Sequence, residues 1–403
     1  AALRVLVRIS RQLSILISKT NAEIQSLLIQ TLSCFKYLKA TDNFSHLKKE
    51  IFVKIKKREA LTFKNQIVKI IPYSMIEPST VLFMSGLILF HVNYTEEKIS
   101  EILISLLFFY KTFNRIFSFQ TVWQKFNSKI GAIEVVEKAS KELLAHRDIL
   151  GNFSLNEFQN VIEFKDVSFC YGEKIVLSNI NFSVQKNKSI GIVGESGAGK
   201  TTIFDILCGL VTPQSGKVSF DGIDYSDLNF LGLRKLLGYV TQEPVIINDT
   251  IANNISFWKC DYDVEICRAK VQEAAKLANC DSFINETENG YETIIGDKGV
   301  KLSGGQRQRI SIAREIFKEP EIIFFDEATS SLDSESELLI QDSINSIMGK
   351  CTIIIIAHRL STIKKCDYIY VLKEGKLIED GTFDNLYTSK DSVFSKMCIA
   401  QNL

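Results

Sequence analysis

Residues 194–201 combine glycine, lysine and threonine in a pattern suited to phosphate binding: Gly194-Glu195-Ser196-Gly197-Ala198-Gly199-Lys200-Thr201. Glycines let backbone N–H groups turn inward around an anion, lysine adds positive charge, and a threonine hydroxyl is an oxygen ligand for Mg²⁺. Residues 190–193 before this segment are strand-like and residues 201–210 after it are helix-like, so the loop is expected to end at the positive N-terminus of a helix. The pattern therefore predicts a loop that binds nucleotide phosphates.

Two carboxylates follow a second strand-like run. Residues 321–325 are apolar after the first residue, which is typical of a buried parallel strand, and Asp326 and Glu327 come next. The carboxyl ends of parallel strands open onto ligand crevices. Asp326 is expected to hold Mg²⁺, and Glu327 to act as a general base toward water. By itself the pair also fits a solvated strand end, and the phosphate loop favours the catalytic interpretation.

The segment Leu302-Ser303-Gly304-Gly305-Gln306 is the most specific motif. Together with the phosphate loop and the two strand acids, it resembles the signature sequence of ATP-binding cassette (ABC) ATPases. Other elements of that family appear in order: an aromatic residue for adenine at Tyr171, a Q-loop glutamine at Gln242, a D-loop at residues 330–333, and a switch histidine at His358. The resemblance covers residues 161–386 closely.

The resemblance implies an α/β P-loop NTPase domain, with an antiparallel β subdomain and a helical signature subdomain, that hydrolyses ATP with Mg²⁺. Glu327, His358 and Gln242 would be catalytic, with His358 holding the γ-phosphate and orienting Glu327. ATP would be bound by Tyr171, Gly194, Glu195, Ser196, Gly197, Ala198, Gly199, Lys200, Thr201, Thr202 and Gln242. Mg²⁺ would be held by Thr201, Gln242 and Asp326.

A second chain belongs to the site that the resemblance implies, because each ATP would be sandwiched between the phosphate loop of one chain and the signature of the other. Ser303, Gly304, Gly305 and Gln306 would contact the partner's ATP, and the D-loop residues Ser331 and Asp333 would lie beside it. A serine hydroxyl, glycine N–H groups and a helix N-terminus can stabilise the charge of a transferring phosphoryl group. Both half-sites are intact, which is compatible with a heterodimer and favours a homodimer.

One segment departs from the family. ABC exporters usually carry glutamate in a Gly-Glu-x-Gly stretch before the signature, where this chain reads Gly296-Asp297-Lys298-Gly299. The negative charge is kept, and the side chain is shorter.

The N-terminal part of the chain has a different character. Residues 1–150 carry a net charge of +10 and residues 151–403 a net charge of −9, which together make the +1 of the whole chain of 403 residues. Residues 3–69 show helical spacing, and two apolar segments follow at 70–92 and 99–110. Their length fits a buried helical hairpin or a pair of membrane spans equally well. The basic flanks favour the membrane interpretation.

By position and character, residues 1–130 resemble the C-terminal part of an ABC exporter transmembrane domain. That resemblance implies a coupling helix near residues 33–45 and the last two spans near 70–92 and 99–122. The expected domains are the partial transmembrane domain at 1–130, a linker at 131–160, the ABC ATP-binding domain at 161–387 and a C-terminal tail at 388–403. Because the chain opens without Met, an earlier segment is expected before Ala1. Lys111 and Arg115 are candidates to contact an anionic head group or to reach the membrane interface.

These patterns predict the ATP-hydrolysing half of an ABC exporter that moves a lipid, glycolipid, peptide or drug-like substrate. A slight further resemblance is to lipid-linked oligosaccharide flippases. The expected location is the cell membrane, as a multi-pass protein with the ATP-binding domain in the cytoplasm. A second half-transporter chain and membrane lipids are the expected partners, and nucleic acid is not. The alternative is a soluble or partner-dependent ABC ATPase that takes no part in transport.

Composition narrows the possible classes further. The chain is 46% hydrophobic and 24% charged, which excludes disordered and collagen-like proteins. Its nine cysteines are odd in number and lack a Cys-x-x-Cys pair, so the sequence indicates neither a disulfide framework nor a zinc site.

Overall fold

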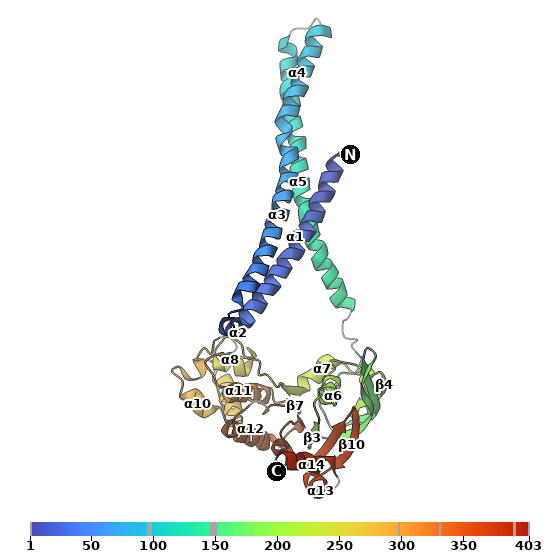
Figure 1. Cartoon of the computed structure of the whole chain (residues 1–403), viewed down its shortest axis with the longest axis vertical. Coiled ribbons are helices and arrows are strands. Elements are labelled where there is room, and N and C mark those ends of the chain that lie inside the picture. The colour runs from blue at the N-terminus through green and yellow to red at the C-terminus, as the bar shows by residue number, and fades with distance from the viewer. Residues whose placement is uncertain are drawn as a thin grey trace. The chain divides into compact units, whose positions relative to one another are not determined.

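The computed structural model describes residues 2–94, 99–145, 151–296, 299–329, 332–389 and 392–401. The chain divides into two compact units, Ala1–Asp148 and Ile149–Leu403. Figure 1 colours both units along the sequence. The first unit is helical, and the second combines strands with helices.

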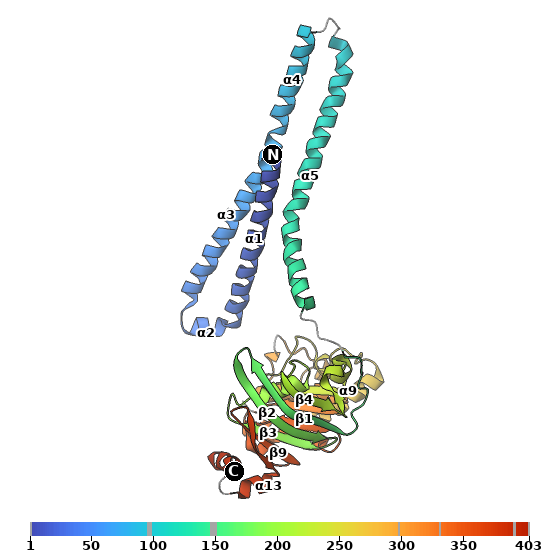
Figure 2. The same ribbon diagram turned by 90° about the vertical axis from the view of Figure 1, so that its right-hand side faces the viewer.

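The N-terminal unit consists of long helices. They are α1 (Ala2–Ser33), α2 (Phe35–Ala40), α3 (Phe44–Ser74), α4 (Ile76–Tyr94) and α5 (Ile99–Ala145). Helix α1 packs along α3 and α5, and α4 packs along α5 (Figures 1 and 2). The short helix α2 connects α1 to α3 within the region where the sequence predicts a coupling helix.

Polar contacts fix the position of α1 against its neighbours. The Ser10 hydroxyl donates a hydrogen bond of 3.0 Å to the amide oxygen of Asn65 in α3, and both side chains are buried. Lys54 in α3 pairs with Glu23 in α1 at 2.7 Å. Solvent screens the ion pair, because Lys54 is only partly buried and Glu23 is exposed, whereas breaking a buried hydrogen bond leaves its partner unsatisfied. The Ser10 contact therefore sets the register of α1 on α3 more strongly than the ion pair does.

No helix in the described part of the chain is both long enough and apolar enough to cross a membrane. The spans expected near residues 70–92 and 99–122 are therefore not confirmed. The structure divides the first stretch between α3, which ends at Ser74, and α4, which begins at Ile76. The second stretch is the first half of α5, which continues to Ala145.

The second unit begins with an antiparallel sheet in the order β2-β1-β4-β5. Its strands are β1 (Val161–Tyr171), β2 (Lys174–Gln185), β4 (Ser215–Phe220) and β5 (Ile223–Asp224). Figure 2 shows β1, β2 and β4 side by side. The antiparallel pairing that the sequence predicts from residue 161 onward is confirmed by the β1–β2 register.

A second sheet carries the residues predicted to bind nucleotide, and its order is β10-β9-β3-β8-β7-β6. Its strands are β3 (Ser189–Gly194), β6 (Leu237–Val240), β7 (Ile322–Asp326), β8 (Thr352–Ile356), β9 (Tyr368–Lys373) and β10 (Lys376–Gly381). All neighbours are parallel except β9 and β10. The phosphate loop, the two acids and His358 therefore follow the carboxyl ends of three adjacent strands.

Helices cover this sheet and connect its strands. They are α6 (Lys200–Leu207), α7 (Phe230–Leu236), α8 (Ile251–Ser256), α9 (Glu265–Leu277), α10 (Asp281–Asn285), α11 (Gly304–Phe317), α12 (Ser334–Ile347), α13 (Phe383–Thr388) and α14 (Val393–Ala400). Short 3₁₀ helices are η1 (Tyr225–Asp227), η2 (Gly290–Glu292) and η4 (Leu360–Ile363). Helix α6 follows the phosphate loop as predicted, and it ends at Leu207, earlier than the expected residue 210.

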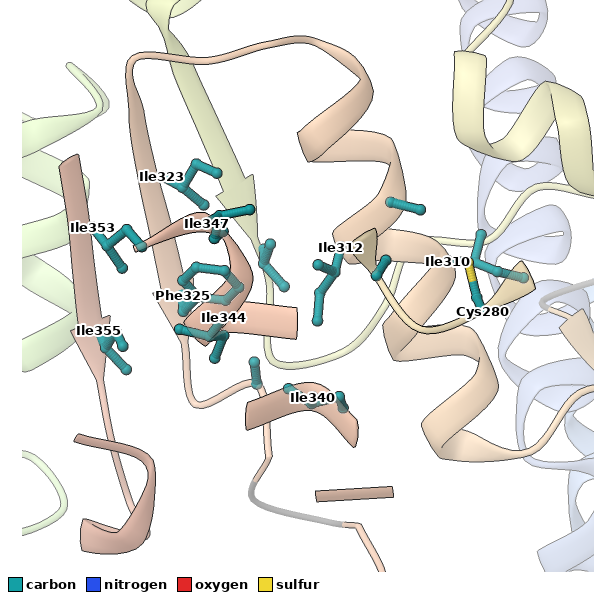
Figure 3. Packing of buried hydrophobic residues seen from close by; sticks show 14 of the residues in the cluster. Cys280, Ile310, Ile312, Ile323, Phe325, Ile340, Ile344, Ile347, Ile353 and Ile355 are labelled. Atoms are coloured by element: carbon teal, nitrogen blue, oxygen red, sulfur yellow. The ribbon is translucent and has the colours of Figure 1, made fainter. Parts of the chain in front are cut away.

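Alternate residues of β7 build two cores, one on each face of the sheet. Ile322 and Phe324 pack with α6 and the antiparallel sheet, and the rings of Phe324 and Phe204 lie 5.1 Å apart. Ile323 and Phe325 pack on the other face with α11 and α12 (Figure 3). Both faces are covered because parallel strands need apolar cover on each side. The strand that ends in the two acids is therefore held rigidly.

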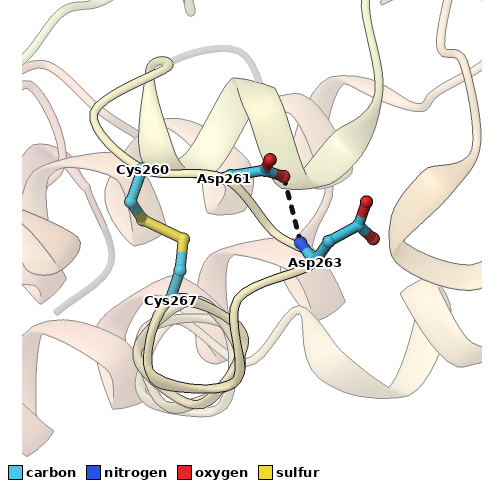
Figure 4. The surroundings of a disulfide bond; sticks show 4 residues. All are labelled: Cys260, Asp261, Asp263 and Cys267. Carbon is cyan, nitrogen blue, oxygen red and sulfur yellow. Dashed lines mark hydrogen bonds between the residues drawn. A yellow bond between two sulfur atoms is a disulfide. The ribbon is translucent and has the colours of Figure 1, made fainter.

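A disulfide joins Cys260 to Cys267, which corrects the sequence prediction. It closes the loop between α8 and α9, where the Asp263 N–H donates to the carboxylate of Asp261 at 3.1 Å (Figure 4). The seven-residue spacing matches no familiar cysteine motif, and only the fold of the loop brings the two sulfurs together. The other seven cysteines are free.

Replacing Phe325 by alanine tests the core under the acids. Phe325 is 0% exposed, and its truncation is expected to lower the free energy of unfolding by about 3–5 kcal/mol. Urea unfolding of residues 149–403 can be followed by the fluorescence of Trp258, the single tryptophan of that unit. The control Leu338→Ala removes a side chain that is 61% exposed and should change stability by no more than about 0.5 kcal/mol. Equal losses for the two variants would contradict this packing.

Candidate functional site

At two glycines of the phosphate loop, the surrounding atoms leave no room for a side chain. Gly199 is the N-cap of α6 with a φ of 103°, and a Cβ atom there would lie 2.7 Å from Leu177. A Cβ atom at Gly194 would lie 2.1 Å from the carbonyl oxygen of Leu372. Glycine at these positions lets β3 turn sharply into α6, so that the N-terminal N–H groups of α6 face the loop.

Lys200 is held inside this loop. Its ammonium donates hydrogen bonds to the carbonyl oxygens of Gly194 at 2.9 Å and Glu195 at 3.0 Å, and the residue is only 6% exposed. Burial lowers the pKa of Lys200, whereas the nearby charges of Glu327 and Asp326 raise it. A buried ammonium at a helix N-terminus creates a strong positive field, which suits a triphosphate.

A cavity of about 470 Å³ opens in front of the loop. Its lining includes Tyr171, Ser196, Gly197, Gly199, Lys200, Thr201, Thr202 and Glu327, all of them predicted from the sequence. Tyr171 stands at one end, 51% exposed, with its ring edge-on to Phe169 at 4.8 Å and its hydroxyl 3.4 Å from the carboxylate of Asp205. The structure therefore brings the expected adenine platform and phosphate loop to one cavity.

Asp326 ends β7 in a partly buried position. One carboxylate oxygen accepts a hydrogen bond of 3.1 Å from the Tyr239 hydroxyl on the neighbouring strand β6. Burial raises the pKa of Asp326, and the hydrogen bond from Tyr239 lowers it by a smaller amount. A buried carboxylate with a raised pKa is poised to gain from a nearby cation, since the cation offsets the cost of burying the charge.

Glu327 and Gln242 meet directly. The Gln242 side-chain N–H donates to the Glu327 carboxylate at 3.1 Å, although the two residues are 85 positions apart in the chain. Glu327 adopts a left-handed φ of 46°, which is uncommon for glutamate, and its N–H is held by the carbonyl oxygen of Ile356 at 3.0 Å. The pairing of β7 with β8 thus fixes an unusual backbone that turns this carboxylate toward the cavity.

The signature segment forms the capped start of α11. The Ser303 hydroxyl accepts from the Gln306 N–H at 3.2 Å, and the Gln306 side chain accepts from the Ser303 N–H at 2.8 Å, which is a capping box. Gly305 packs against α12, because a Cβ atom there would lie 2.2 Å from the Ser336 hydroxyl. None of Ser303, Gly304, Gly305 and Gln306 is among the residues that line the phosphate cavity.

The signature instead borders another cavity, of about 840 Å³. Gly304 and Gln308 from α11 line it together with Gln242, Ala328 and Leu332. The Gln308 side chain donates to the carbonyl oxygen of Thr241 at 3.1 Å, which ties the Q-loop to the signature helix.

Two further predicted positions lie outside the phosphate cavity. Asp333 is the N-cap of α12, where hydrogen bonds from Ser336 lower the pKa of its carboxyl. His358 is exposed and lies two residues beyond the end of β8 at Ile356. Ser331 and Asp297, with Lys298, lie outside the described residues.

Several residues that line the cavity are not predicted from the sequence. Lys174, Ile175 and Val176 from the start of β2, and Glu374 and Gly375 from the turn between β9 and β10, line it as well. Gly375 adopts a φ of 76°, and a Cβ atom there would lie 2.4 Å from the carbonyl oxygen of Val176. The dipeptide Glu374-Gly375 is a recognisable turn signal, but nothing local shows that this turn packs against β2.

The ABC transporter family model matches residues 177–330, which include the phosphate loop, the Q-loop, the signature and both acids. The chain carries the ATP-binding domain of an ABC transporter. The match confirms the family that the sequence motifs indicate. It also confirms that this domain is an ABC transporter ATPase domain. Proteins similar to it include two named ATP-dependent lipid A-core flippase.

Relatives of the ABC domain extend the comparison to the N-terminal unit. The ATP-dependent lipid A-core flippase of Desulfotalea psychrophila is 33% identical over 385 residues, which cover 94% of this chain and 66% of the flippase. The protein of the same name from Coxiella burnetii is 43% identical over 240 residues, 59% of this chain and 40% of that protein. The chain thus spans less than two thirds of the length of these curated relatives.

A solved structure resembles the whole chain. A bacterial Atm1-family ABC exporter with ATP bound superposes with a TM-score of 0.83 at 27% identity, covering 100% of this chain and 71% of the exporter. The α/β fold expected for the ABC domain, with its antiparallel β subdomain, is therefore confirmed, and the second sheet is mixed.

The raised pKa of Asp326 predicts a pH-dependent effect of Asp326→Asn on the ABC domain. Above the pKa of Asp326 in the folded protein, the buried carboxylate is charged and destabilises the folded state. Below the pKa of an ordinary aspartate, the carboxyl group is neutral in the folded and in the unfolded protein, and this cost is absent. Removing the charge should therefore raise the unfolding temperature near neutral pH, and the gain should shrink as the pH falls through this window. Thermal unfolding of both proteins across pH measures the difference.

The matched control is Asp333→Asn. Because the pKa of Asp333 is lowered, its charge favours the folded state, so its removal should give no gain near neutral pH. A stabilisation by Asp326→Asn that is the same at acid and neutral pH would contradict a charge effect.

Proposed function

We propose that this chain is the ATP-hydrolysing half of an ABC exporter. The observation that carries the proposal is the hydrogen bond of 3.1 Å between Gln242 and Glu327 beside the phosphate cavity that holds Lys200. A carboxylate fixed next to a phosphate site by a neutral amide can accept a proton from water, and the amide can orient that water.

Each residue at the cavity has a distinct part in hydrolysis. Lys200 and the α6 N-terminus attract the phosphates, and Tyr171 stacks on the adenine. Glu327 accepts a proton from the attacking water while Gln242 holds the geometry. His358 does not line the cavity, but it follows the carboxyl end of β8. It contacts the γ-phosphate when that phosphate extends from the cavity toward this strand end.

Mg²⁺ fits the donor set at this place. The Thr201 hydroxyl, a carboxylate oxygen of Asp326 and the side-chain carbonyl oxygen of Gln242 are hard oxygen ligands, which Mg²⁺ prefers. The raised pKa of Asp326 supports this assignment, because a cation would relieve the cost of its buried charge. The bound ion would neutralise the charge on the phosphates.

A second chain completes the site in this proposal. The signature residues Ser303, Gly304, Gly305 and Gln306 do not line the phosphate cavity of their own chain. The preformed cap of α11 offers a helix N-terminus to an ATP on a facing subunit. Both half-sites are intact in this one sequence, so a homodimer needs no other component, and Ser331 and Asp333 would lie at its interface.

The proposed transport function is supported by the proteins that this chain is similar to. The Desulfotalea psychrophila relative, which matches 94% of the chain, is named a lipid A-core flippase, and the similar solved structure is an exporter. We therefore assign the chain to a membrane exporter with its ATP-binding domain in the cytoplasm, which moves a lipid, glycolipid, peptide or drug-like molecule. The alternative, an ABC ATPase without transport, finds no support among these relatives.

Replacing Glu327 by glutamine tests the composite site. The variant should bind ATP normally but lose hydrolysis by at least about 10²-fold, since general base catalysis contributes that much. Trapped ATP should then hold two ABC domains together. Size-exclusion chromatography of residues 149–403 with ATP and Mg²⁺ should show a dimer for Glu327→Gln.

Lys200→Ala is the matched control, because it removes the phosphate contact and leaves Glu327 in place. This variant should stay monomeric with ATP. If Glu327→Gln also elutes as a monomer at high protein concentration with ATP and Mg²⁺, the two-chain site is wrong.

A further inference from the structure

The loop after β8 carries His358. β8 ends at Ile356, and the 3₁₀ helix η4 begins at Leu360. Arg359 is the N-cap of η4, and its side chain makes no capping hydrogen bond. The first N–H groups of any helix need partners from outside the helix, and Leu360 is 0% exposed. This loop therefore depends on another part of the chain for its hydrogen bonds.

Gln401, at the end of α14, supplies that partner. Its side-chain N–H donates to the carbonyl oxygen of His358 at 2.8 Å, and its side-chain oxygen accepts from the N–H of Leu360 at 2.9 Å. One amide thus bridges the peptide groups on both sides of Arg359. An amide side chain offers a donor and an acceptor on neighbouring atoms, whereas a carboxylate only accepts and an ammonium only donates.

The position of Gln401 is fixed by the rest of α14 (Figure 1). At its start, the Glu379 carboxylate from β10 accepts the N–H groups of Val393 at 2.6 Å and Phe394 at 3.0 Å. Phe394 is fully buried and packs edge-on against Phe383 at 5.4 Å. Because the helix is anchored at one end and along one face, the amide at its other end is held at a defined place.

The other side of the same loop is tied to α12. The Arg359 guanidinium pairs with the Glu337 carboxylate and donates to the carbonyl oxygen of Leu332 at 3.0 Å. The Ser361 hydroxyl donates to Glu337 at 2.8 Å. The loop is thus held on two sides. Gln401 binds its backbone, and Glu337 binds its side chains.

We propose that Gln401 is a positioning residue for ATP hydrolysis. Its amide holds the backbone of His358, so that the imidazole meets the γ-phosphate in a fixed orientation. The proposal rests on the proposed function, in which His358 contacts that phosphate. It makes the C-terminal end of the chain part of the hydrolytic machinery, although Gln401 does not line the phosphate cavity.

Gln401→Met keeps the length of the side chain and removes both hydrogen bonds. In the full chain, kcat for ATP should fall about tenfold, which is the usual effect of losing one or two such bonds. KM for ATP should not change, because Tyr171 and Lys200 are untouched. Gln401→Glu keeps the acceptor for Leu360 but sets a carboxylate oxygen against the carbonyl of His358, so its kcat should fall at least as far.

A double mutant separates positioning from a general structural role. If Gln401 acts through His358, adding Gln401→Met to His358→Ala should cause no further loss of kcat. The control Lys396→Gln changes an exposed residue of the same helix and should retain full kcat. Thermal unfolding of each variant checks that it is folded.

Three results would overturn the proposal. The first is a normal kcat for Gln401→Met when His358→Ala is impaired, which leaves the proposed function intact. The second is the same fold loss from Gln401→Met with and without His358, which would assign Gln401 a purely structural role. The third is full activity of His358→Ala, which would remove the proposed role of His358 as well.

Discussion

The insertion of β8 between β3 and β7 is the constraint on which the site depends. Parallel pairing on both sides of β8 brings the carboxyl ends of these three strands to one edge of the sheet. Lys200, Glu327 and His358 come from segments far apart in sequence, and this pairing brings the ends of the three strands that precede them to the same edge. The two apolar faces of β7 keep that edge rigid, so the energy that orders the site comes from burial of isoleucine and phenylalanine below it.

Local chemistry made much of the ABC domain predictable. A glycine loop between strand and helix, or a serine followed three residues later by glutamine, carries its structural meaning within a few residues. The phosphate loop formed between a strand and a helix as the sequence indicates, and the apolar run that precedes Asp326 formed the interior strand β7. Helix α11 begins after Ser303, where the resemblance implies a helix N-terminus.

Features that depend on tertiary structure could not be predicted in this way. Gln401 looks like an ordinary residue near a chain end, and 43 positions separate it from His358. Gly375 and Lys174 reach the cavity only because two hairpins pack together, and the partner of Cys260 is set by the path of a loop. In the N-terminal unit, apolar runs were an unreliable guide, because the boundary between α3 and α4 falls inside one of them.

The capping box of α11 bears on the selectivity of the signature. One lone pair of the Ser303 hydroxyl oxygen already accepts the Gln306 N–H, and its O–H remains able to donate to a ligand. Glycine N–H groups at the same helix end are donors too. In the proposed two-chain site these donors would face an ionised phosphate oxygen, which accepts hydrogen bonds. Because the cap is formed within one chain, that contact would need little reorganisation of the helix end.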